Sequence, residues 1–220
     1  MVNRATNRCI KTVSFLVIIA ATVTRPGLCA NPADLRLKLV VYDFADIPDR
    51  DWRRAQSVVF GIFAQAGIHL GWRVGNPVEP EARLLEYRAI PAAGGCTLPA
   101  GGTELRARLI LQAPDNVPLG ALGSSLPCAR KGVQVTIFSD RVEAVTRNAH
   151  VSYGRALGHA LAHEIGHVLL RDPQHTEIGI MRGFWTRADW QRAAVELMAF
   201  DAEQAKRMQE DVLARVSFDP

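Results

Sequence analysis

Short apolar stretches, separated by polar and turn-forming residues, recur through the first two-thirds of the chain. Each alternates at least in part between apolar and polar positions, which predicts β-strands. The stretches cover residues 35–44, 68–74, 105–112, 119–125 and 133–138, and the fourth has the character of a short edge strand. Between the first two, residues 49–66 place apolar side chains at helical spacing and Gly67 follows them. A helix is therefore predicted there.

The period of the apolar positions changes after residue 138. Residues 153–170 carry their leucines and branched residues on one helix face, and Pro173 stops the pattern. Thr186 and Asp189 have the spacing of a capping box, and a last helix is expected over residues 201–215. This order predicts an α+β fold with a twisted mixed sheet of about five strands, a long helix after it, and further C-terminal helices.

The positive charge of the chain is confined to its N-terminus. The sequence of 220 residues has 26 Lys and Arg and 22 Asp and Glu. Four of the basic residues and none of the acidic ones fall in residues 1–30, which leaves 22 of each in residues 31–220. A main body without net charge argues against a nucleic-acid partner.

The first thirty residues have the three regions of a secretory signal peptide. A basic start is followed by an apolar run at residues 12–23 and by a short polar tail that ends at the small Ala30. The run is shorter than the roughly 20 residues that span a membrane, although an uncleaved anchor is the alternative. We therefore predict a signal peptide at 1–30, a single domain at 31–220 without membrane contact after cleavage, and export to the periplasm or the extracellular medium.

Export determines how the cysteines are interpreted. Cys9 and Cys29 would leave with the signal peptide, so the mature chain keeps Cys96 and Cys128. Two cysteines in an oxidising compartment predict one disulfide bond, with a pair of free thiols as the alternative.

The candidate chemistry lies in the predicted helix at residues 163–167, which read HEIGH. His163 and His167 are four residues apart and thus lie on one helix face, where both imidazoles can reach one metal ion. Glu164 points about 100° further round the helix axis and can reach a metal-bound water without binding the metal. This is the arrangement of a catalytic zinc site, with Glu164 as general base.

A catalytic zinc ion needs a third protein ligand and one open position. His175 is the leading candidate, because the chain can turn back after Pro173 and a neutral imidazole keeps the zinc electrophilic. Asp172 and Glu177 are the competing ligands within the same reach. The predicted cofactor is one catalytic Zn²⁺ ion held by His163, His167 and His175.

These residues resemble a known family. The HEIGH segment, His175 and the sequence Gly179-Ile180-Met181-Arg182 are similar to the metzincin zinc endopeptidases, and to small secreted bacterial metzincin- or matrixin-like proteins in particular. The resemblance implies a metzincin-like fold with a long zinc-binding helix, and it places Met181 in a turn beneath the metal. The spacing departs from the usual HExxHxxGxxH pattern, because Leu170 stands at the glycine position and Pro173 at the third histidine position. No tyrosine stands two residues after Met181, where this chain has Gly183.

The sequence hypothesis is thus a secreted zinc endopeptidase that hydrolyses peptide bonds of a protein or peptide substrate bound along the edge strand. A secreted zinc-binding module without turnover, its fourth metal position closed by the altered turn, is the alternative. A structural exported domain with a fortuitous motif is a third reading. His159 is expected to be a partly exposed surface residue, and Trp185 and Trp190 are expected to pack in the core.

Overall fold

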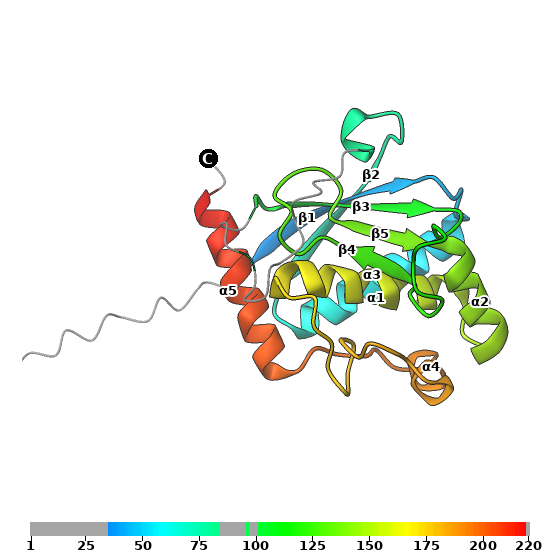
Figure 1. Cartoon of the computed structure of the whole chain (residues 1–220). Helices are drawn as coiled ribbons and strands as arrows, with labels where there is room; N and C mark the ends of the chain where they lie inside the picture. The colour runs from blue at the N-terminus through cyan, green and yellow to red at the C-terminus, as the bar shows by residue number, and fades with distance from the viewer. Residues whose placement is uncertain (1–34, 84–95, 97–100, 219–220) are drawn as a thin grey trace, which may run out of the picture.

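The computed structural model describes residues 35–83, 96 and 101–218 (Figure 1). The predicted signal peptide at 1–30 lies outside the described residues. No helix within the described part is long and apolar enough to cross a membrane. The elements are β1 (Arg36–Asp43), α1 (Asp49–Gln65), β2 (His69–Gly75), the short 3₁₀ turn η2 (Pro80–Ala82), β3 (Glu104–Ile110), β4 (Gly123–Ser125), β5 (Val135–Phe138), α2 (Ser139–Ala149), α3 (Tyr153–Leu170), α4 (Arg187–Ala193) and α5 (Ala202–Phe218).

The strands form one mixed sheet in the order β2-β1-β3-β5-β4. β1 pairs in parallel with β2 and β3, and β3 pairs in parallel with β5. β4 runs antiparallel to β5 and is an edge of the sheet. The register places Leu39 opposite Trp72 on one side and opposite Leu105 on the other. The predicted α+β class with five strands in a mixed sheet is confirmed, as is the edge strand expected within residues 119–125.

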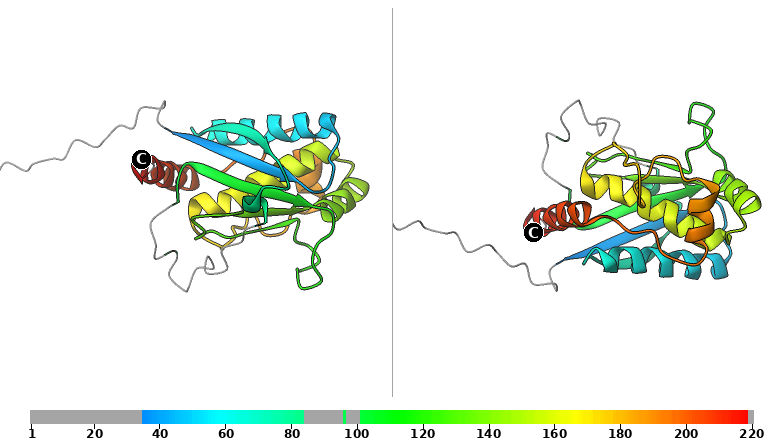
Figure 2. Two further views of the ribbon diagram at one scale, coloured as in Figure 1. Left: turned by 90° about the horizontal axis from the view of Figure 1, so that it is seen from above. Right: turned by 90° about the horizontal axis from the view of Figure 1, so that it is seen from below.

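Two long helices, α1 and α3, cover one face of the sheet (Figures 1 and 2). The main core lies between these helices and the sheet, where Leu39, Val41 and Leu109 meet side chains such as Ile62 and Leu161, all without exposed surface. Successive strand residues point to opposite faces. A smaller cluster of Val40, Tyr42, Ala82 and Val133 accordingly packs on the other side of the sheet. The candidate site lies on α3, within the helical layer.

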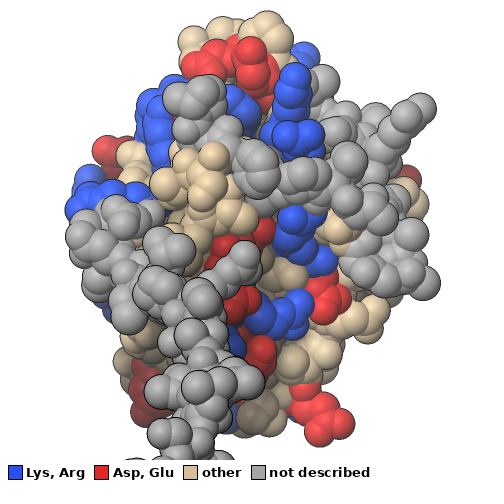
Figure 3. All heavy atoms as spheres, turned by 90° about the vertical axis from the view of Figure 1, so that its left-hand side faces the viewer, with Lys and Arg blue, Asp and Glu red and all other residues tan. Residues whose placement is uncertain are grey.

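The C-terminal helices begin where the sequence predicted. Thr186 Oγ1 accepts the Asp189 N–H at 3.2 Å and Asp189 Oδ2 accepts the Thr186 N–H at 2.8 Å, which confirms the capping box of α4. Asp201 Oδ1 accepts the Gln204 N–H at 2.8 Å at the start of α5. The outer face of α5 is exposed, and Figure 3, viewed from its side, shows Lys and Arg side chains next to Asp and Glu across that surface.

The sequence prediction did not include α2. It expected the helix at residues 153–170 to be the next element after the last strand, and this was wrong because α2 lies between them. α2 starts at Ser139, the residue after β5, so no turn-forming residue separates the two elements. It is mostly polar, and Val142 is its one fully buried large apolar side chain. It ends at Ala149, and the next residue, His150, adopts a left-handed conformation with φ of 56°. The apolar stripe of α2 is short, consisting of Val142, Val145 and Ala149, and no Gly or Pro directly follows the helix as a stop signal.

A disulfide joins Cys96 to Cys128, with 5.3 Å between their Cα atoms. This confirms the predicted pair and contradicts the alternative of free thiols. The two residues are 32 positions apart. Closing a loop of that size stabilises the fold by about 3–4 kcal/mol in the chain-entropy model.

Candidate metal centre

The helix α3 presents His163 and His167 from consecutive turns. Both residues are buried, with 9% and 4% of their surface exposed. Their Nε2 atoms lie 3.1 Å apart, and their ring planes are inclined by 84°. The i, i+4 spacing thus brings the two rings together as predicted.

His175 joins this pair from beyond the end of the helix. Its Nε2 atom lies 3.2 Å from Nε2 of His167, although the residue itself is exposed. Of the competing ligands, Asp172 turns its carboxylate to the N–H of Gln174 at 2.9 Å, and Glu177 is exposed outside the cluster. The structure therefore brings together the three histidines that the sequence prediction favoured.

Backbone carbonyls fix the orientation of both helix histidines. Nδ1 of His163 donates to the carbonyl of Ile180 at 2.7 Å, and Nδ1 of His167 donates to the carbonyl of Asp172 at 2.8 Å. Since a carbonyl oxygen can only accept, Nδ1 carries the proton and Nε2 keeps a free lone pair. Two such lone pairs facing each other at 3.1 Å repel unless a cation lies between them. An outer carbonyl that fixes the tautomer is the usual support of a metal-binding histidine.

The donor set fits zinc. Zn–N bonds of about 2.0–2.1 Å in a tetrahedron separate neighbouring nitrogens by about 3.3–3.4 Å. Two of the three separations, 3.1 and 3.2 Å, are close to this value, and all three ligand atoms lie within 4.8 Å of one another. Burial lowers the pKa of His163 to about 3 and also lowers the pKa of His167 and of His175. The three imidazoles therefore stay neutral near pH 7, which is the form that binds metal. Within the described residues the cluster has three members, all of them histidines.

Glu164 lies against the edge strand and lines the same cleft as the three histidines. It is 8% exposed and accepts a hydrogen bond from the Ser125 side chain. Gly123 allows this approach, since a Cβ atom there would lie 2.9 Å from Cγ of Glu164. Burial raises the pKa of Glu164 to about 7, against which the Ser125 hydrogen bond acts. A carboxyl group with this pKa can both accept and release a proton at neutral pH.

Met181 lies directly against the helix α3. It is 1% exposed, and a Cβ atom on Gly166 would lie 2.6 Å from its sulfur and 2.7 Å from the ring of Phe200. The preceding residue, Ile180, supplies the carbonyl that orients His163. The turn around Met181 therefore both packs under the helix and supports a ligand.

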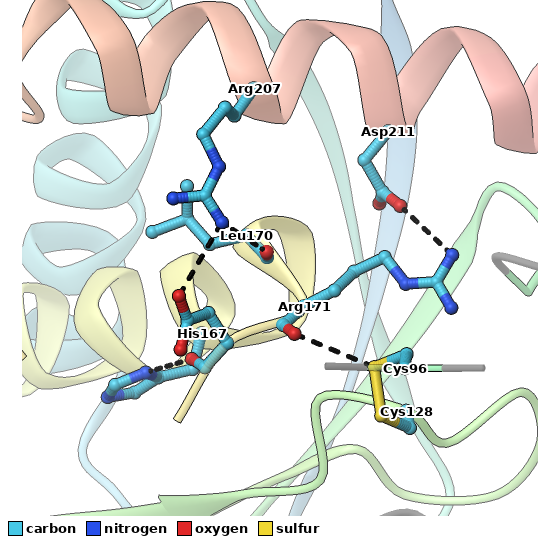
Figure 4. Close-up of a disulfide and its surroundings, with 8 residues drawn as sticks. Cys96, Cys128, His167, Leu170, Arg171, Arg207 and Asp211 are labelled. Carbon is cyan, nitrogen blue, oxygen red and sulfur yellow. Dashed lines mark hydrogen bonds and ion pairs between the residues drawn. A yellow bond between two sulfur atoms is a disulfide. The ribbon is translucent and has the colours of Figure 1, made fainter. Parts of the chain in front are cut away.

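The segment after α3 is held from its outer side (Figure 4). Arg171 adopts a left-handed conformation with φ of 55°, which turns the chain, and its carbonyl oxygen lies 3.6 Å from Sγ of Cys96. Two residues of α5 approach the same segment, Asp211 at 4.0 Å from the Arg171 guanidinium and Arg207 at 3.5 Å from the Asp172 carboxylate. The disulfide and α5 thus buttress the turn that carries the carbonyl partner of His167.

The three histidines open onto a cleft of about 760 Å³. One wall is formed by residues 118–125, which include β4, and the other by residues 182–187. β4 uses one edge to pair with β5, and its residues line the cleft. The structure therefore places an edge strand beside the candidate metal centre.

His159 corrects a sequence prediction. It was expected at the surface, but it has no exposed surface. Its Nδ1 donates to the Arg155 carbonyl at 2.8 Å, and its Nε2 accepts the N–H of Met198 at 3.3 Å. The error arises because the helix pattern shows one apolar stripe, whereas the segment before α5 covers the opposite side of α3. Burial lowers the pKa of His159 to about 4.

The tryptophans divide between core and site. Trp190 is 5% exposed, which confirms its packing role. Trp185 packs against the core, as expected, but its ring also meets His163 edge-on at 5.4 Å and lines the cleft. The sequence prediction gave no role to Ser125, although its place at the end of the edge strand was a signal that could have found it.

Comparisons with known proteins yield only distant structural likeness. No protein family matches the sequence, and no curated protein matches it significantly. Among solved structures, the chain is similar to archaemetzincin from Methanopyrus kandleri, with 15% identity and a TM-score of 0.48 over 80% of this chain and 95% of that one. It is also similar to metalloproteinase-II from Bacteroides fragilis, with 13% identity and a TM-score of 0.46 over 81% of this chain and 53% of that one. Neither likeness is strong enough to transfer an activity to this chain.

Proposed function

We propose that this chain is an exported zinc-dependent endopeptidase of the metzincin or matrixin-like kind, with a signal peptide at residues 1–30 and one catalytic domain at 31–220. The observation that carries the proposal is the convergence of three Nε2 atoms, of His163, His167 and His175, beside a buried carboxyl group at the wall of a cleft. Sites built from a few polar groups in a large cleft are the usual form of an active site.

His163, His167 and His175 would hold a zinc ion, which when bound would lower the pKa of a water and polarise a carbonyl oxygen. Glu164 then accepts a proton from the attacking water and passes it to the amine that leaves. Its buried position beside Ser125 suits this task, since a pKa of about 7 lets the same carboxyl group act as base and as acid. The carbonyls of Ile180 and Asp172 keep the rings of His163 and His167 in place during the proton transfers.

The substrate is an extended peptide that lies along β4. The backbone groups of an edge strand can pair with a peptide strand, and side chains of the peptide then point alternately into the cleft and away from it. The cleft walls offer apolar surface for those side chains, from Leu119 and Leu122 on one side and from Phe184 and Trp185 on the other. This shape fits a peptide better than a small polar substrate.

The test compares Glu164→Gln with the wild type and with Glu177→Gln, which removes an exposed carboxylate outside the cluster. Zinc content and cleavage of a quenched-fluorescence peptide library are measured for all three proteins. We expect each to bind one zinc ion and Glu164→Gln alone to lose activity by about 100-fold or more. Equal cleavage by Glu164→Gln would refute the mechanism. Full zinc loading without cleavage by the wild type would favour the zinc-binding module.

A further inference from the structure

The third ligand lacks the support that the first two have. His163 and His167 each donate a hydrogen bond from Nδ1 to a backbone carbonyl. Nδ1 of His175 has no hydrogen-bond partner among the described residues, and this residue is the exposed member of the cluster. The position of its ring must therefore be determined by packing.

The packing partner of the His175 ring is the backbone of Gly183. A Cβ atom at Gly183 would lie 2.9 Å from Cγ of His175, 3.0 Å from Nδ1 and 3.2 Å from Cβ. These atoms form the base of the imidazole rather than a flexible end, so the whole ring would have to move. The ring also meets His163 and His167, at centroid distances of 5.3 and 4.8 Å. It thus lies within contact distance of Gly183 and of both helix ligands.

Gly183 cannot easily move aside. The Thr176 N–H donates to the carbonyl of Met181 at 2.9 Å, and Thr176 forms a β-bridge with Arg182. Arg182 is also paired with Asp189, in the capping box of α4, at 2.9 Å. The residues that flank His175 and Gly183 are therefore joined to each other and to a helix.

The requirement for glycine at position 183 is one of space. Gly183 does not have a positive φ, unlike Gly179 with φ of 74°. Alanine could therefore adopt its backbone conformation without strain. Any effect of Gly183→Ala then comes from the added methyl group rather than from the backbone.

We propose that Gly183 is a positioning residue for the third metal ligand, because its missing side chain makes the space in which the His175 imidazole turns Nε2 toward the other two. This inference rests on the proposed zinc site. Gly183 fixes the orientation of the His175 ring by packing. The carbonyls of Ile180 and Asp172 fix the rings of the other two histidines by hydrogen bonding.

The chain offers a matched control at Gly120 in the opposite wall of the cleft. A Cβ atom there would lie 3.6 Å from the Phe184 ring, an ordinary contact. Zinc affinity is measured by competition with a chromophoric chelator, and the ligand geometry by the visible absorption of the Co²⁺-loaded protein. Unfolding temperatures of the metal-free proteins show that each variant folds.

We expect Gly183→Ala to weaken zinc binding by about 10- to 100-fold, as the loss of outer support does at other zinc sites, and to alter the Co²⁺ spectrum. Gly120→Ala should match the wild type in both measurements. When His175→Ala is already present, adding Gly183→Ala should change zinc affinity by less than about twofold, because no third ring remains to be displaced.

Three results would count against these ideas, and each points to a different fault. Wild-type affinity in Gly183→Ala would overturn the positioning role while leaving the zinc site intact. An equal loss of affinity from Gly183→Ala with and without His175 would show that the glycine acts elsewhere. A wild-type protein that binds no zinc would overturn the proposed function and this inference with it.

Discussion

His159 should make the fold sensitive to acid in a way that one substitution can isolate. The residue has no exposed surface, and both ring nitrogens bond to backbone groups as a neutral imidazole. Burial, assisted by the nearby Arg155 charge, lowers its pKa from 6.5 to about 4. The hydrogen bond to the Arg155 carbonyl acts in the opposite direction but does not outweigh the burial.

The sign of the effect follows from the two pKa values. As the pH falls below 6.5, the unfolded chain takes up a proton on His159 that the fold cannot accept until about pH 4. The stability that the neutral ring confers is thus complete above pH 6.5 and is lost progressively between 6.5 and 4. Between about pH 7.5 and 5.0 the loss amounts to about 2 kcal/mol, at about 1.4 kcal/mol for each unit of pKa.

Urea unfolding of the wild type and of His159→Gln, at pH 7.5 and at pH 5.0, measures how much of the acid-induced loss of stability comes from His159. Glutamine keeps one donor and one acceptor but does not titrate, and a chelator in every sample removes any contribution from metal binding. We expect the variant to be less stable at pH 7.5, yet to lose about 2 kcal/mol less than the wild type on going to pH 5.0. Parallel losses in the two proteins would refute the reasoning, because the acid sensitivity would then belong to other groups.

Three further substitutions test the supports of the site. The double variant Cys96→Ser/Cys128→Ser should lose about 3–4 kcal/mol in urea unfolding, and the reduced wild type should behave in the same way; an unchanged midpoint would contradict this. In Gly123→Ala, the added Cβ atom would lie 2.7 Å from the Thr136 carbonyl oxygen of β5 and 2.9 Å from Cγ of Glu164. We expect a loss of about 1–3 kcal/mol in thermal unfolding together with reduced peptide cleavage, and wild-type values for both would count against the close approach. Arg155→Met removes a buried hydrogen bond of 2.6 Å to the carbonyl of Ala193, at the end of α4, and a partly buried one of 2.7 Å to the carbonyl of Glu196. It should cost about 2–4 kcal/mol, whereas Arg192→Met, on the exposed side of α4, should stay within about 0.5 kcal/mol; equal effects would show that the buried bonds do not stabilise the fold.

The parts of the site that follow from local geometry could be predicted from the sequence. An i, i+4 pair of histidines on a helix has little freedom, so the positions of His163 and His167 follow once the helix is recognised. The capping box of α4 and the disulfide are local or compositional signals of the same kind. The edge strand was also found, because its apolar stretch is short and irregular.

The supports of the site could not be predicted, because they come from parts of the chain that meet only in the fold. The carbonyls that orient His163 and His167 belong to Ile180 and Asp172, and every residue has a carbonyl. The buried state of His159 depends on a hydrogen bond from Met198, 39 residues away. A helix pattern records the stripe that faces the sheet, and it does not show that a later segment will cover the other side.

The late position of the third histidine illustrates how these local and distant effects combine. His175 comes two residues later than the pattern of the resembling family, so sequence spacing alone leaves its direction open. The structure absorbs the extra residues in a turn: Arg171 takes the left-handed conformation, and the Asp172 carboxylate accepts the Gln174 N–H at 2.9 Å, which closes an Asx turn across Pro173. The β-bridge between Thr176 and Arg182 then holds the segment that follows His175 against the turn around Met181. A metal site needs its nitrogens to converge, and a turn of any length that achieves this can supply the third ligand.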